Sequence, residues 1–146
     1  SFPTRRSSDL ANGAIAMVQP DVCVWDMPDT PHDLSALLRT FDAATTRVYL
    51  EKQWARPTDG KVQAFANGHG YGLLMGVMAT LGIAYELVAP ATWKLAMGLR
   101  GKEKADSRQK AQELYPTAPL ARVKDHGRAE ALLIAHYGHR VLGGTK

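Results

Sequence analysis

The sequence predicts a single domain of mixed α/β class. Four short apolar runs have the length of strands, and longer segments between and after them carry apolar residues at the 3.6-residue period of a helix. The chain has 146 residues, of which 45% are hydrophobic, so one compact domain with its own core is expected. The order of these segments favours a mixed sheet flanked by helices.

The strands are expected where apolar, β-branched or aromatic residues cluster between turn residues. The first two are joined by the turn Gln19, Pro20 and Asp21. The third ends in an acid, Glu51, and a polar loop follows it. The four expected strands cover residues 13–18, 21–25, 47–51 and 83–88.

Five helices are expected from the apolar period and from capping residues. Thr30 or Asp33 is predicted to cap the first helix and Thr92 the third. Pro116 ends the fourth. The expected helices cover residues 34–41, about 62–81, 92–97, 102–115 and 125 to about 137.

The long second helix carries Gly68, Gly72 and Gly76, each four residues apart. Glycine costs a helix interior about 1 kcal/mol per site, so three on one face need a reason. Two interpretations stand side by side. The stripe either packs densely inside the monomer or forms a helix-to-helix seam of a homodimer.

Composition narrows the functional classes only modestly. The net charge of +4 and the pI of about 9.3 are compatible with a polyanionic partner and do not require one. A single cysteine excludes an internal disulfide and a paired-cysteine zinc site. No apolar run approaches the roughly 20 residues of a membrane span, and no signal peptide is visible. A cytoplasmic setting, in a bacterial or phage-infected cell, is therefore expected.

Residues 1–10 have neither strand alternation nor helical periodicity. They match a translated sequencing adapter, so we interpret them as a foreign leader and the sequence as a fragment whose true start is lost. The predicted organisation is a leader at residues 1–10, a domain at residues 11–140 and a flexible tail at residues 141–146.

Three acids lie at the edges of apolar segments: Glu51, Asp125 and Glu130. Burying a carboxylate in an apolar run is costly unless its negative charge is compensated. A bound Mg²⁺ would supply the compensating positive charge. Each acid also has an ordinary explanation. Asp125 fits a helix N-cap, Glu130 a partly exposed helix position, and Glu51 a strand-end ion pair with Lys52 or Arg47. Five helical residues turn about 500°, so Asp125 can approach Glu130 only from the first turn or before it.

Longer stretches of the chain resemble RuvC-like Holliday junction resolvases, in the branch of small phage and bacterial enzymes and plant chloroplast resolvases. The similarity covers residues 13 to about 138. The matching stretches are GAIA (13–16), WDMP (25–28), VYLEKQ (48–53), GYGLLMGVMATLGIAYELVAPATWK (70–94), GKEKADSR (101–108) and KDHGRAEALLIAHYG (124–138). The resemblance implies an RNase H-like fold with a five-stranded mixed sheet, and a metal-dependent endonuclease that cuts four-way DNA junctions.

The resemblance also implies a site of four carboxylates around Mg²⁺, or Mn²⁺ as a substitute, with two ions. Glu51, Asp125 and Glu130 match three of them, and His126 could assist with a water or the scissile phosphate. The family's first aspartate falls on Ser8, with Asp9 one residue out of register. The first ligand and the central strand are therefore expected to be missing, so the parent protein is expected to be an active nuclease and this chain to be inactive or poorly folded.

DNA contacts are expected from basic residues and from one aromatic, with Trp54 as an alternative to Phe65 at the junction centre. A solvated helix face and a core role for Phe65 remain open. The candidate DNA-binding residues are Lys61, Gln63, Phe65, Lys94, Arg100, Lys102, Lys104, Arg108, Lys110, Lys124 and Arg128. Two other functions remain open. One is an RNase H-like nuclease acting on flaps, forks or RNA–DNA hybrids, and the other is a catalytically dead junction-binding module.

Overall fold

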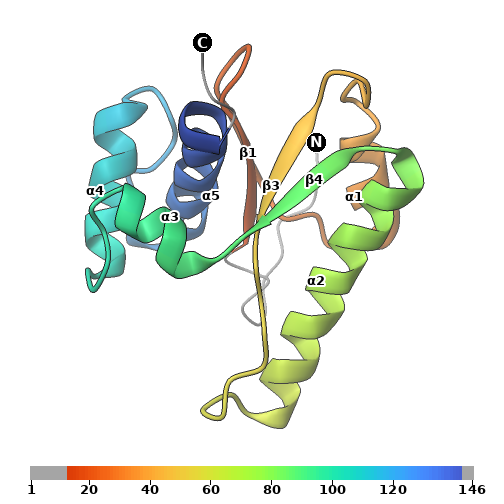
Figure 1. Cartoon of the computed structure of the whole chain (residues 1–146), viewed down its shortest axis with the longest axis horizontal. Helices are drawn as coiled ribbons and strands as arrows, with labels where there is room; N and C mark the ends of the chain where they lie inside the picture. Colours follow the sequence, from red (N-terminus) through yellow and green to blue (C-terminus); the bar gives the residue numbers. More distant parts are fainter. Residues whose placement is uncertain (1–12, 143–146) are drawn as a thin grey trace.

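The computed structural model describes residues 13–142 and confirms the mixed α/β class (Figure 1). Its strands are β1 (Ala14–Met17), β2 (Cys23–Asp26), β3 (Arg47–Glu51) and β4 (Ala84–Val88). Its helices are α1 (Pro31–Leu38), α2 (Lys61–Leu81), α3 (Pro90–Ala96), α4 (Lys104–Leu114) and α5 (His126–Tyr137). A 3-10 turn at Val123–Asp125 precedes α5, and a π-helical turn at Gly138–Leu142 follows it. The predicted elements therefore all form, with bounds shifted by a few residues.

The strands form two pairs. β1 and β2 are antiparallel, with Ile15 opposite Trp25, and their turn contains a cis peptide bond before Pro20. β3 and β4 are parallel, with Leu50 opposite Leu87, and α2 makes the crossover between them. Glu51 thus lies at the carboxyl end of β3, beside the end of β4.

The prediction of one five-stranded sheet differs from what the described residues form, which is four strands in two separate two-stranded sheets. β1 and β3 each pair on one side only. A cavity of about 1160 Å³ lies along both strands. The central strand was expected before Gly13. The predicted leader at residues 1–10 and residues 143–146 of the predicted tail lie outside the described residues.

Helices cover both sides of the strands. In Figure 1, α3, α4 and α5 lie together on one side, and α1 and α2 lie on the other. One core cluster, between α5 and the strands, includes Trp93, Leu132 and Leu133, with Ala16 and Tyr49 packed against it. The other core lies under α1 and α2 and gathers Leu34, Leu38, Met78 and Ile83, against which Ile15, Val48 and Leu50 pack. Successive residues of β1, and of β3, therefore face the two different cores, as they would if both strands belonged to one sheet.

Of the two predicted helix caps, one forms and one does not, and a third helix has a cap that was not predicted. The hydroxyl of Thr30 accepts from the backbone N–H of Asp33, so Thr30 caps α1 as predicted. Thr92 does not cap α3, because the helix begins at Pro90, whose fixed φ and missing N–H suit the first helical position. Glu103 and Asp106 form a reciprocal capping box at the start of α4.

The glycine stripe of α2 is exposed. Among the residues that the structure describes, a β-carbon placed at Gly68, Gly72 or Gly76 would meet no atom within 4 Å beyond the neighbouring backbone of α2 itself. Dense packing against these residues, one of the two interpretations, is therefore wrong for this stripe. Within residues 13–142, no helix is both long enough and apolar enough to cross a membrane.

Candidate active site

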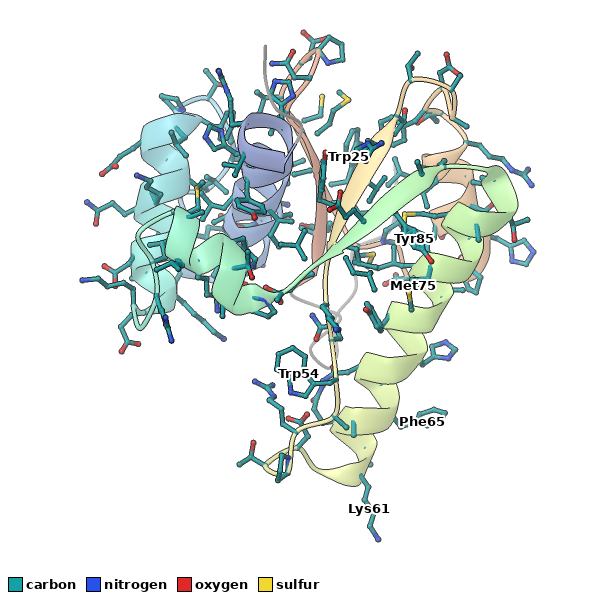
Figure 2. The ribbon with its side chains drawn as sticks, viewed as in Figure 1. Trp25, Trp54, Lys61, Phe65, Met75 and Tyr85 are labelled. Carbon is teal, nitrogen blue, oxygen red and sulfur yellow. The ribbon has the colours of Figure 1, made fainter. Side chains whose placement is uncertain are left out.

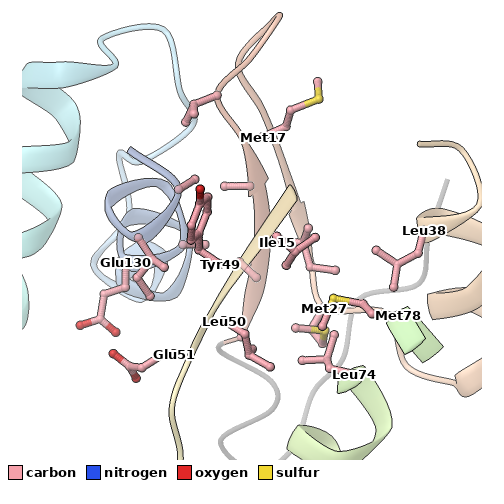
Figure 3. Close-up of a pocket in the computed structure, with 18 of the residues that line it drawn as sticks. Ile15, Met17, Met27, Leu38, Tyr49, Leu50, Glu51, Leu74, Met78 and Glu130 are labelled. Carbon is pink, nitrogen blue, oxygen red and sulfur yellow. The ribbon is translucent and has the colours of Figure 1, made fainter. Parts of the chain in front are cut away.

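Glu51 and Glu130 face each other at one end of the cavity between β1 and β3 (Figure 3). Glu51 comes from the last position of β3, and Glu130 from the second turn of α5. Burial raises the pKa of Glu130, and the negative charge of Glu51 raises it further. Lys94, His126 and Lys104 act in the opposite direction. The site therefore combines two acids with too little positive charge to offset them, as a cation-binding site does.

The carboxylate of Glu51 is held from both sides. The indole Nε1 of Trp93 donates to its Oε2 at 2.7 Å, and the amide Nε2 of Gln53 donates to its Oε1 at 3.2 Å. Trp93 is fully buried, whereas Gln53 is exposed. Neither Trp93 nor Gln53 was predicted from the sequence to bond Glu51. The one available signal was that a buried tryptophan usually finds an acceptor for its N–H.

Asp125 occupies a different environment. It is 3% exposed and does not line the cavity that contains Glu51 and Glu130. Arg122 donates its backbone N–H to Asp125 at 2.8 Å and its guanidinium Nη2 at 2.8 Å. Burial acts to raise the pKa of Asp125, but the bonds from Arg122 and the charge of Arg128 leave that pKa below its ordinary value. Asp125 is thus an ionised acid balanced by arginines.

Unlike the adjacent Asp125, His126 lines the same cavity as Glu51 and Glu130. It opens α5 four residues before Glu130, a spacing that places both on one helix face, and both line the cavity. Within the described part of the chain, no three His, Cys, Asp or Glu side chains come together in a way that could hold a metal ion. Glu51, Glu130 and His126 therefore line one cavity, whereas Asp125 is bound by Arg122.

The predicted DNA-binding cations occupy several environments. Lys94 and Lys104 lie near Glu130, and Arg100 and Lys102 lie in the loop between α3 and α4, where both are exposed. Gly98 and Gly101 adopt positive φ angles in this loop, which only glycine does without strain. Lys110 is half-buried on α4, and Lys124 is exposed before α5.

Two of the predicted cations are engaged within the protein instead. Arg108 donates to the backbone carbonyls of Leu120 and Ala121, at 3.3 and 2.9 Å. Arg128 binds both carboxylate oxygens of Asp26. Their guanidinium groups hold the segment before α5 and the end of β2 in place, so both arginines stabilise the fold through these contacts.

The start of α2 and the loop before it extend away from the rest of the molecule (Figure 2). Phe65 is 78% exposed and Trp54 58%, so the core alternative for Phe65 is wrong. The Phe65 ring stacks on His69, with ring centroids 6.3 Å apart. Lys61 is exposed, and Gln63 donates to Asn67. Aromatic, polar and basic groups therefore share one projecting arm.

Comparison with known proteins gives one informative match. No family model matches the chain. The chloroplastic Holliday junction resolvase MOC1 of Chlamydomonas reinhardtii is 36% identical over 148 aligned positions, which cover 78% of this chain and 17% of that protein. The chain therefore spans about a sixth of the length of this relative. The relative's chloroplast location lends no support to the predicted bacterial or phage cytoplasm.

Proposed function

Because the chain belongs to the Holliday junction resolvase family, we propose that it carries the nuclease site of a metal-dependent enzyme that cuts four-way DNA junctions. The observation that supports this most directly is the pair Glu51 and Glu130, two acids facing each other beside Lys94 and Lys104. Acids that face a cavity rimmed by cations suit a substrate of phosphodiesters and a divalent ion.

Mg²⁺, with Mn²⁺ as a substitute, is the cofactor we propose. Glu51 and Glu130 fit it, because Mg²⁺ is commonly held by one or two carboxylates and completes its shell with waters and substrate phosphates. His126 is placed to orient a water or a phosphate. Asp125 would join them only after releasing Arg122. When two ions are bound, they supply an activated water and charge compensation for the leaving oxygen.

DNA would lie across the mouth of this site. Lys94 and Lys104 are placed for phosphates near the cut, and Arg100 and Lys102 for phosphates further along. Phe65 or Trp54, on the projecting arm, offers a face on which an unstacked base of the junction centre can stack. The loop of the arm starts directly after Glu51, so one branched molecule could reach both the arm and the site.

We propose an RNase H-like fold in which a fifth strand lies between β1 and β3. Alternate backbone groups of both strands point away from their existing partners, and both strands line the cavity. A strand from outside residues 13–142 would join the two pairs into one sheet. It would also enter beside Glu51, where a further acid could complete the site.

A homodimer joined through Gly68, Gly72 and Gly76 is the assembly we propose. Two matched cuts in a junction call for two sites related by two-fold symmetry. The exposed stripe supports this arrangement because, within residues 13–142, a β-carbon added at any of the three glycines would meet no neighbouring element within 4 Å. Its surface is free of long side chains, so two copies of α2 could approach closely.

A second candidate function is junction binding without cleavage. It is favoured by the lack, among the residues that the structure describes, of three ligands grouped for a metal ion. It predicts affinity for branched DNA and no nicks at any Mg²⁺ concentration.

One assay separates the two candidates. The chain, and a version extended by a family-type first strand with its aspartate, are incubated with a synthetic four-way junction and Mg²⁺. We expect paired symmetric nicks from the extended version, abolished by Glu51→Gln and retained by Glu113→Gln, the same change at an exposed residue of α4. Binding without nicks by both versions would exclude the nuclease. Preferential cutting of a flap or an RNA–DNA hybrid would exclude the junction as the main substrate.

A further inference from the structure

Trp93 is the most deeply buried large side chain next to the candidate site. It is 0% exposed and belongs to the core cluster formed with α5. Its indole N–H is its single polar group, and that group donates to Glu51 Oε2 at 2.7 Å. A hydrogen bond of this length to a carboxylate is of the strong, charge-assisted kind.

The contact joins a donor in the core to an acceptor at the end of a strand. A glutamate loses considerable rotamer freedom when it is fixed, and Gln53, the other donor to Glu51, is an exposed side chain of a polar loop. The indole ring is held in place by the core. Lys94, the next residue, lies with its Nζ 5.6 Å from the Trp93 ring centroid, so the same short helix presents both the indole and a cation to the site.

We propose that Trp93 is a positioning residue, which fixes the Glu51 carboxylate by Oε2 so that Oε1 can exchange its contact with the exposed Gln53 side chain for a divalent cation. The proposal rests on the proposed metal-dependent function. Partners that orient a ligand from outside commonly change metal affinity by 10–100-fold when they are removed. Trp93→Phe removes the N–H and keeps most of the ring, so we expect Mn²⁺ to bind about 10-fold more weakly.

The metal titration uses the full chain and Mn²⁺ alone, followed by the electron paramagnetic resonance of the free ion. Trp25→Phe, the same change at a tryptophan of β2 that does not line the cavity, is the matched control and should bind Mn²⁺ like the wild type. Glu51→Gln tests the underlying site. If Glu51→Gln leaves Mn²⁺ binding unchanged, the proposed metal site fails. If Glu51→Gln weakens binding and Trp93→Phe matches Trp25→Phe, the positioning role fails and the metal site stands.

A second readout needs neither metal nor a Trp93 variant that folds. The chain has three tryptophans, so a ¹⁵N spectrum shows three indole N–H signals. We expect the signal of Trp93 to lie apart from the other two and to exchange slowly with solvent. In Glu51→Gln it should move more than the signals of Trp25 and Trp54. A Trp93 signal that does not respond to Glu51→Gln would overturn the proposal.

Discussion

The side chains of Asp26 and Arg128 tie the end of β2 to α5. Arg128 donates from Nε to Oδ1 at 2.8 Å and from Nη2 to Oδ2 at 3.0 Å. The bond from Arg128 holds the pKa of Asp26 below its ordinary value. An acid whose pKa is lowered by folding stabilises the fold above its unfolded pKa. That stabilisation disappears as the pH falls through the lowered, folded pKa.

Asp26→Asn should therefore lower the free energy of unfolding at pH 7 by about 2 kcal/mol, the scale of a hydrogen bond between charged groups. The difference from the wild type should shrink as the pH falls below about 4 and through the folded pKa of Asp26. Urea unfolding at several pH values measures both effects. Asp21→Asn, the same change at an exposed residue of the turn between β1 and β2, is the control. Equal stability of the two variants at pH 7 would contradict the expectation.

Single residues differ in how much the sequence reveals of them. Glu51 and Glu130 were identifiable because an acid in an apolar run is costly without compensation. The tie between Asp125 and Arg122 was not, because it depends on how the loop before α5 folds into a 3-10 turn. The donor role of Trp93 was hidden for a related reason. Its acceptor lies 42 residues away along the chain, and no local pattern signals such a contact.

At the level of elements, periodicity located each strand and helix. The third strand was predicted with the observed bounds, and α2 differs by one residue at its start. Pairing was harder to predict, because it depends on residues that lie apart in the sequence. The glycine spacing in α2 was equally ambiguous. Glycines at every fourth position leave a helix face that another backbone could approach closely. Whether another element does so depends on the tertiary structure.

Gly72→Leu tests what covers that face. In the monomer the side chain would project into open space and improve helix propensity by up to about 1 kcal/mol, so thermal stability should be equal or higher. If two α2 helices meet at the stripe, leucine separates them. We expect analytical ultracentrifugation to show a dimer for the wild type and a monomer for Gly72→Leu. Ala105→Leu, at an exposed position of α4, should remain dimeric. A monomeric wild type would rule out the seam.

At the scale of the molecule, residues 13–142 form two strand pairs and two cores, with a cavity that β1 and β3 both line. In Figure 3 the side chains of Ile15, Tyr49 and Leu50 border this space, and Glu51 lies at one end of it. Every residue of β1 is only half-buried, although the central strands of α/β proteins are normally covered on both faces. The two halves of the sheet therefore leave apolar side chains and backbone groups partly exposed where a further strand would cover them.

An added strand should therefore stabilise the chain as well as extend it. Completing the burial of Ile15, Val48 and Leu50 should raise the free energy of unfolding by about 1 kcal/mol for each side chain. Together the three should raise Tm by roughly 5–10 °C for a domain of this size. We expect that gain when an alternating apolar segment is fused ahead of Gly13. The control is the same segment with prolines at alternate positions, which cannot pair with β1 and β3. Calorimetry measures Tm, and hydrogen exchange should slow at amides of both strands only for the pairing segment. Equal Tm values for the two fusions would mean that the cavity does not accept a strand and that the two sheets are the finished architecture.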